Sequence, residues 1–246
     1  MLAAMRVHAV PHAGAINELH LPDWRAVVID VVRASSTIAQ AIASGAASVI
    51  PVSTVDEALA LRGESIGDDV LLAGERGGLP PPGFDLGNSP ALFTSEAVAG
   101  KRVIFTTTNG TAAILGVAAA RECIIGSFLN VLAVVEHLVG QGDDGDDVVL
   151  VPVGRDGGPV LDDQACAGLF VDKLAHRVPG CQVTDGARQV RKAYRQYRGR
   201  ILDALRDSAS GQALVEIGLG NDLEHCARLG LLDVVPVYVD GAVRAR

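Results

Sequence analysis

Short apolar runs rich in β-branched residues recur along the chain, separated by stretches with helical spacing. The runs cover residues 5–10, 26–30, 48–52, 70–73, 102–106, 123–126, 148–153 and 234–239. Several are continuously apolar, as expected for strands buried on both faces of a sheet. Because helices of roughly ten to fifteen residues fit between them, the pattern predicts parallel strands joined by crossover helices. We therefore expect an α/β fold with three layers, α/β/α, around a largely parallel or mixed central sheet.

The hydrophobic fraction of 49% is ample for such a core. We expect residues 1–246 to form a single α/β domain, which could consist of two closely packed lobes. Local signals agree with the alternation of elements: Ser53 and Thr54, followed by Glu57, form a capping box that predicts a helix start.

Charge and hydropathy exclude several classes of protein. The formal net charge of −8 argues against a nucleic-acid partner, and the basic cluster at 188–200 is interpreted as a surface helix rather than an RNA-binding stripe. No apolar run reaches the roughly 18 residues of a membrane span, and the N-terminal residues do not resemble a signal peptide. We therefore expect a cytoplasmic protein that does not bind membranes.

The four cysteines, Cys123, Cys166, Cys181 and Cys226, are scattered without a CxxC pair. This spacing predicts neither a disulfide framework nor a zinc site, so we expect reduced thiols that are mostly buried. Cys166 is interpreted as a small core residue rather than a nucleophile, because no histidine is visibly placed to activate it.

Polar residues follow four of the apolar runs, where open α/β sheets place their ligand sites. The candidates are Asp30, Arg33, Ser36 and Thr37 after the run 26–30; Glu75 and Arg76 after 70–73; Thr108, Asn109 and Gly110 after 102–106; and Asp163 after 148–153. Each group alone has an ordinary structural explanation: hydroxyls cap helices, acidic residues favour a first helical turn, and an arginine can pair with a nearby aspartate.

Together, these groups favour phosphate chemistry. Asp30, Glu75 and Asp163 would converge as hard oxygen ligands suited to Mg²⁺. Arg33, Arg76 and the turn at 108–110 would supply anion donors beside them, as phosphoryl transfer requires. The sequence therefore predicts a metal-dependent phosphatase. It is not of the haloacid-dehalogenase type, because Val32 stands where that pattern needs a second aspartate, and no GxxxxGK[ST] nucleotide loop is present.

The segment 74–90, GERGGLPPPGFDLGNSP, is too rich in glycine and proline to be a helix or strand. We interpret it as a binding loop that caps the phosphate site, with Glu75 and Arg76 facing the metal and substrate and the three prolines stiffening the return path. The alternative is that the prolines and Phe84 pack on a second subunit.

Four stretches, in this order, resemble the 2-phosphosulfolactate phosphatase family: VVIDVVRASSTIAQAIASGA, GERGGLPPPGFDLGNSP, TTTNGTAA and LDDQACAG. The similarity spans roughly residues 26–174, with a looser match in GLGNDLEHCARLGLLDVVPVYVDG near the C-terminus. It implies a cytosolic, homodimeric, Mg²⁺-dependent α/β hydrolase that removes phosphate from 2-phospho-3-sulfolactate in coenzyme M biosynthesis.

Two positions depart from the family pattern as the resemblance implies it. Ala112 stands where a basic residue is common, and Asp162 with Asp163 replaces Glu-Asp. The first change removes a cation from the edge of the expected site, so the reaction class is better supported than the substrate. Attack by water and attack by Asp30 both remain open, and the alternatives to this enzyme are a phosphoester-binding module or a phosphatase for another phosphorylated organic acid.

Overall fold

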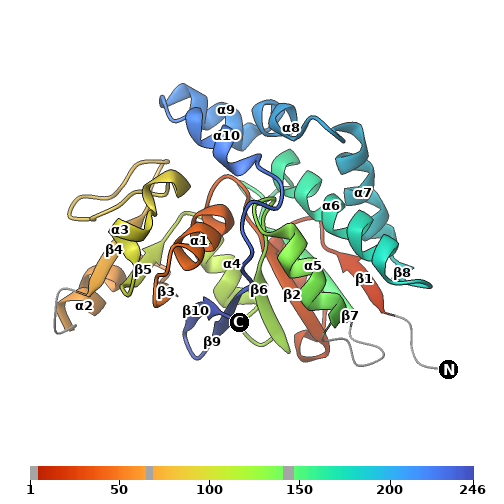
Figure 1. Ribbon diagram of the computed structural model, residues 1–246, viewed down its shortest axis with the longest axis horizontal. Coiled ribbons are helices and arrows are strands. Elements are labelled where there is room, and N and C mark those ends of the chain that lie inside the picture. Colours follow the sequence, from red (N-terminus) through yellow and green to blue (C-terminus); the bar gives the residue numbers. More distant parts are fainter. Residues whose placement is uncertain (1–4, 65–68, 141–146) are drawn as a thin grey trace.

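The computed structural model describes residues 5–64, 69–140 and 147–246, so the first four residues of the N-terminal stretch lie outside it. In this part of the chain, strands join into a ten-stranded sheet in the order β4-β5-β3-β10-β9-β6-β2-β7-β1-β8 (Figure 1). The strands are β1 (Arg6–Ala9), β2 (Trp24–Ile29), β3 (Ser48–Pro51), β4 (Val70–Gly74), β5 (Arg102–Thr106), β6 (Glu122–Ile125), β7 (Asp147–Pro152), β8 (Gln182–Val183), β9 (Pro236–Val239) and β10 (Ala242–Ala245).

Helices cover the sheet on both sides (Figure 1). They are α1 (Ala34–Ala43), α2 (Val55–Glu64), α3 (Ser95–Val98), α4 (Gly110–Gly116), α5 (Val131–Gly140), α6 (Leu161–Arg177), α7 (Asp185–Gln196), α8 (Ile201–Asp207), α9 (Ala209–Glu216) and α10 (Asn221–Cys226), with 3₁₀ turns at Ala13–Glu18, Leu21–Asp23 and Pro90–Leu92. The predicted capping box is confirmed: Thr54 accepts a hydrogen bond from the Glu57 N–H, and the Glu57 carboxylate accepts one from Ser53 N–H, just before α2.

The buried strand β2 shows how the layers form. Its alternate residues face opposite sides, as the period of a strand requires. Val27 and Ile29 belong to one hydrophobic core with residues of α5 and α6, whereas Ala26 and Val28 belong to another with residues of α1 and α4. All eight expected strands are present, and the α/β prediction with a mixed, mostly parallel sheet is confirmed.

The sheet contains two parallel groups separated by the β9–β10 hairpin. Strands β1, β2, β6, β7 and β8 are parallel to one another, as are β3, β4 and β5. Antiparallel pairings of β6 with β9, β9 with β10 and β10 with β3 lie between them, so the groups formally run in opposite directions. Sheets twist by roughly 20–25° per strand, and the steps from β2 to β5 therefore turn the strand direction by more than a right angle.

This twist brings the residues after β5 against those after β2. A Cβ added to Gly110, the first residue of α4, would lie 2.5 Å from an Asp30 carboxylate oxygen. Helices α8, α9 and α10 lie over this edge of the sheet (Figure 1). Junctions that are distant in the sequence thus meet below the C-terminal helices.

Three smaller expectations can be compared with the structure. All four cysteines are free, and Cys123, Cys166 and Cys226 are buried, as predicted. Phe84 is half-buried and packs against the small core that holds Leu72 and Ile104. No helix in the described ranges is long and apolar enough to cross a membrane.

Candidate functional site

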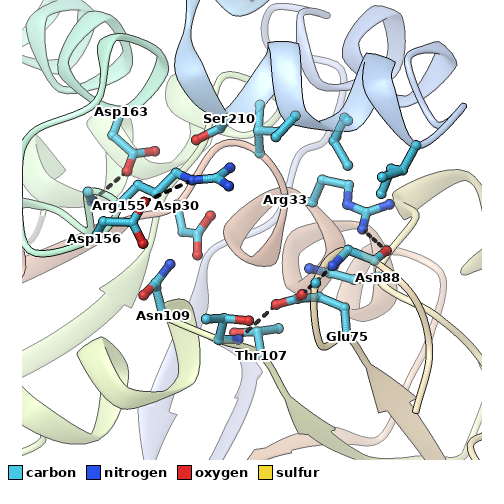
Figure 2. Close-up of a pocket in the computed structure, with 18 of the residues that line it drawn as sticks. Asp30, Arg33, Glu75, Asn88, Thr107, Asn109, Arg155, Asp156, Asp163 and Ser210 are labelled. Atoms are coloured by element: carbon cyan, nitrogen blue, oxygen red, sulfur yellow. Dashed lines mark hydrogen bonds and ion pairs between the residues drawn. The ribbon is translucent and has the colours of Figure 1, made fainter. Parts of the chain in front are cut away.

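A cavity of about 360 Å³ opens where β2, β4, β5 and β7 end, and one face of α9 covers it (Figure 2). Its lining residues are Asp30, Val32, Arg33, Glu75, Gly77, Gly78, Asn88, Thr107, Thr108, Asn109, Gly154, Arg155, Asp156, Asp163, Ser210, Ala213, Leu214, Glu216 and Ile217. Six of the predicted site residues are therefore brought together: Asp30, Arg33, Glu75, Thr108, Asn109 and Asp163.

Asp30 lies between the two sides of the cavity (Figure 2). Its backbone is held in a turn that leads into α1, because its carbonyl accepts from Ser35 N–H and its own N–H donates to Ser35 Oγ. Burial, together with the nearby charges of Asp162 and Glu75, raises the pKa of Asp30 to about 7, against a smaller lowering by the Ala34 N–H and Arg33. The acid is thus poised to change protonation near neutral pH.

Asp163 joins the ends of two neighbouring strands. One carboxylate oxygen accepts from Val31 N–H at 2.8 Å and the other from Gly154 N–H at 2.9 Å. Its burial, together with the charges of Asp162 and Asp30, holds its pKa well above the usual range. Asp163 therefore fixes the floor of the cavity and places a second carboxyl group near Asp30.

Glu75 performs a similar task for the loop 74–90. Its carboxylate accepts hydrogen bonds from Gly78 N–H and Thr108 N–H, each 2.8 Å long. The first contact closes the tight turn of the loop, and the second attaches that turn to the junction between β5 and α4. Glu75 is thus a ligand-facing carboxylate whose position is fixed by backbone donors.

Asp162, the neighbour of Asp163, is almost fully buried and was not among the predicted site residues. Burial raises its pKa to about 6. Its Oδ1 atom has no hydrogen-bond partner, an uncommon state for a buried oxygen. The acidic cluster thus contains mutual repulsion, which a bound cation would relieve, and, at Asp162 outside the cavity lining, an unsatisfied oxygen.

Arg33 is the buried cation of the cavity. Its Nη1 donates to Asp222 on α10 at 2.7 Å, and its Nη2 donates to the Gly78 carbonyl at 2.6 Å. These contacts hold the guanidinium rigidly on the side of the cavity opposite Asp163 (Figure 2). A fixed guanidinium is well suited to phosphate oxygens.

Four predicted site residues do not line the cavity. Ser36 and Thr37 are buried, and their hydroxyls donate to the carbonyls of Val31 and Asn88. They hold α1 and the end of the loop in place. The physical reason is that a buried hydroxyl must find an acceptor, and here backbone carbonyls are nearer than the cavity.

Arg76 and Gly110 also lie outside the cavity lining, and both support residues that are part of it. The Arg76 guanidinium donates to the carbonyls of Glu75 and Ser53 and to Thr106 Oγ1, so it anchors the loop to the strand ends. Gly110 packs against Ala34 and the Asp30 carboxylate, where a larger residue would not fit. Cys166 is fully buried in the core with a pKa well above the usual range because of burial, in agreement with the core interpretation.

The structure adds residues that sequence reasoning missed. Arg155 follows β7 and obeys the same strand-end rule as the other candidates, so it could have been found. The face of α9 carried no such signal, since its only pattern is a helical spacing of small and apolar residues: Ser210, Ala213, Leu214 and Ile217.

Comparison with known proteins gives a consistent result over nearly the whole chain. The family described as "2-phosphosulpholactate phosphatase" matches residues 12–241. A protein of Clostridium acetobutylicum is 37% identical over 239 residues, covering 97% of this chain and 100% of its own. One from Deinococcus radiodurans is 41% identical (92% of each chain), and one from Thermotoga maritima is 39% identical (88% of this chain, 89% of its own). All three are named "Probable 2-phosphosulfolactate phosphatase".

Proposed function

The chain belongs to the 2-phosphosulfolactate phosphatase family, and from this premise we propose that it is a Mg²⁺-dependent phosphatase of small phosphorylated hydroxy acids. The proposed substrate is 2-phospho-3-sulfolactate, cleaved to 3-sulfolactate and phosphate as in coenzyme M biosynthesis. The observation that carries the proposal is the meeting of Asp30, Glu75 and Asp163 with Arg33 in one cavity.

Charge balance supports a metal cofactor. The lining contains five acidic residues, Asp30, Glu75, Asp156, Asp163 and Glu216, but only two arginines, Arg33 and Arg155. When these acids are ionised, an anionic ester would be repelled by this surplus unless a cation were bound. The raised pKa of Asp30 agrees with such a cation.

The carboxylates also set a limit on how the metal is held. Among the described residues, no three Asp, Glu, His or Cys side chains are already arranged to hold a metal ion. Mg²⁺ does not require such a cage, because it usually binds one or two carboxylates, water and substrate phosphate oxygens. We propose Asp30 as the direct ligand, with Glu75 and Asp163 beside it. The metal would neutralise phosphate charge and polarise the scissile group.

The protein's own groups supply positioning. Arg33 holds phosphate oxygens, while Thr108 and Asn109, at the junction with α4, are within the same lining. Glu75 and Asp163 hold the backbone of the four junctions after β2, β4, β5 and β7 in pairs at fixed separations, through their hydrogen bonds to N–H groups. Fixed groups of this kind stabilise developing charge without reorganising during the reaction. The homodimer is part of the same proposal.

The test is release of inorganic phosphate from 2-phospho-3-sulfolactate and from other phosphorylated hydroxy acids. We expect turnover with Mg²⁺, loss in excess chelator and recovery when Mg²⁺ is restored. Asp30→Asn should abolish turnover, whereas Asp185→Asn, at an exposed position on α7, should not. Saturable binding of these esters without any turnover would instead support a phosphoester-binding module, and undiminished turnover in chelator would exclude the metal.

A further inference from the structure

Two loops at the cavity have the same unusual backbone. In the first, Arg76 and Leu79 exchange a reciprocal pair of backbone hydrogen bonds around Gly77 and Gly78. In the second, Arg155 and Gly158 do the same around Asp156 and Gly157. The central residues all have positive φ, between 51° and 86°, as in type I′ turns. Each loop thus presents one arginine at the start of a rigid turn that follows a parallel strand.

The two arginines are used differently. The Arg76 guanidinium is tied to the Ser53 carbonyl and Thr106 Oγ1 and does not line the cavity. Arg155 lines the cavity on the side of Asp163 and Ser210 (Figure 2). Its ion pair with the adjacent Asp156 is 3.4 Å long, and the Asp156 side chain is 90% exposed, so the pair is weak and easily exchanged. Arg155 therefore has donors to offer to a ligand.

Arg33 and Arg155 also differ in rigidity. Arg33 is buried and fixed by short hydrogen bonds to Asp222 and Gly78, the state that stabilisation of a reacting phosphate demands. The side chain of Arg155 is 42% exposed and can adjust. The rigid Arg33 thus suits the phosphate group that reacts, and the adjustable Arg155 suits a second anionic group of the ligand.

We propose that Arg155 is a specificity-determining residue that binds the carboxylate or sulfonate group of the substrate that is not hydrolysed. This inference rests on the proposed function. Ser210, Ala213 and Leu214 on α9, with Ile217 just after the helix, follow i, i+3, i+4, i+7 spacing and cover the space beside the two arginines, next to Glu216. Their small and apolar side chains leave room for a short carbon chain between the two arginines.

Ala112 lies in TTTNGTAA, the third of the stretches that resemble the family. Ala112, where the resemblance implies a basic residue, is exposed on α4 and does not line the cavity. The second anionic subsite proposed here therefore rests on Arg155, which lines the cavity, and not on position 112.

The experiment compares two esters. 2-Phospho-3-sulfolactate carries further acid groups, whereas p-nitrophenyl phosphate carries none. For Arg155→Gln we expect KM for the first ester to rise about tenfold to hundredfold, the usual effect of losing a charge-assisted hydrogen bond. We expect little change in kcat for 2-phospho-3-sulfolactate, in kcat/KM for p-nitrophenyl phosphate or in the melting temperature of this variant. Arg155→Lys should have a KM between those of Arg155→Gln and wild type. Arg198→Gln, at an exposed arginine after α7, is the matched control and should resemble wild type.

If the protein shows no turnover, the role of Arg155 can be tested by calorimetry, which measures the binding of inorganic phosphate and of 3-sulfolactate. Arg155→Gln should weaken binding of 3-sulfolactate and leave that of phosphate unchanged. If Arg155→Gln weakened turnover of both esters equally, or binding of both ligands equally, Arg155 would belong to the phosphate and the proposal would be overturned. The proposal would also be overturned if neither turnover nor binding were weakened. A wild-type protein that hydrolyses neither ester would refute the proposed phosphatase, while the two dissociation constants would still decide the role of Arg155.

Discussion

Arg33 and Asp222 stand 189 positions apart in the sequence and are joined by a hydrogen bond of 2.7 Å between Nη1 and Oδ2. Their side chains are only 3% and 9% exposed. Asp222 also accepts a hydrogen bond from Ser89 at the end of the loop 74–90. A single carboxylate on α10 therefore connects the junction after β2, the loop 74–90 and the C-terminal helices around the cavity.

Removal of this carboxylate should be costly. Asp222→Ala would leave the Arg33 charge buried without a counterion, and such a loss typically lowers the free energy of unfolding by about 3–5 kcal/mol. Glu224→Ala on the same helix is the control, since its ion pair with Arg206 is 3.7 Å long and mostly exposed. Glu224→Ala should change the free energy of unfolding by no more than about 1 kcal/mol. Urea denaturation of both variants checks the prediction, and equal losses would contradict it.

Much of the fold could be predicted because its strands are buried and apolar. The eight runs read from the sequence all form strands, since continuous burial imposes continuous hydrophobicity. Strands β8 and β10 were missed for identifiable reasons. The first has only two residues, Gln182–Val183, and the second, Ala242–Ala245, is exposed over its last two residues and offers only a two-residue apolar run before Arg244. The reversal of direction at the β9–β10 hairpin leaves no mark in local patterns, because pairing partners are set by tertiary packing.

The site was predicted only as far as strand ends reveal it. Asp30, Glu75 and Asp163 follow apolar runs, and all three line the cavity. Side-chain direction was beyond the sequence: Arg76 follows the same rule, yet its guanidinium points to backbone carbonyls. The α9 face was also hidden, because a helix that covers a cavity has the same spacing of apolar residues as one that covers a core.

The close contact between Gly110 and Asp30 gives a second prediction. In Gly110→Ala the new Cβ would lie 2.5 Å from both the Asp30 carboxylate and the Ala34 side chain, so the carboxylate must move. A displacement of about 1 Å at a reacting group can cost about a hundredfold in rate. We expect kcat/KM for the phosphoester to fall at least tenfold.

The control for this variant lies at the other end of the same helix. A Cβ at Gly116 would meet nothing within 4 Å, and its backbone has no positive φ. Gly116→Ala should keep wild-type activity and gain up to about 1 kcal/mol of stability, because alanine loses less backbone entropy on folding. Similar activity in the two variants would show that the packing around Asp30 does not matter for catalysis.

Metal binding should be visible without any turnover. If Mg²⁺ relieves repulsion among the buried acids, it should raise the melting temperature relative to chelator. At about a hundredfold excess over Kd the gain is about 2.7 kcal/mol, or roughly 5–10 °C for a chain of this size. Asp30→Asn should melt higher than wild type in chelator and respond little to Mg²⁺, and Asp185→Asn should respond like wild type. An undiminished response in Asp30→Asn would remove Asp30 from the metal site.

The last prediction concerns pH and follows from the same acids. The pKa of Asp30 is about 7 in the folded protein, because of burial and the charges of Asp162 and Glu75, against an ordinary value of 3.8. Between these values the folded state holds the proton more tightly than the unfolded state does. The contribution of Asp30 to stability is therefore complete below about pH 4 and is lost as the pH rises through about 7, by at most about 1.4 kcal/mol per pH unit. In chelator, urea unfolding of wild type should thus show a free energy that falls more steeply from pH 4.5 to 7.5 than that of Asp30→Asn. The comparison cancels the general repulsion of an acidic protein, because both chains share it. Parallel pH profiles would show that the Asp30 carboxyl titrates normally, and its burial beside Asp162 and Asp163 would then not create the repulsion that a bound cation is proposed to relieve.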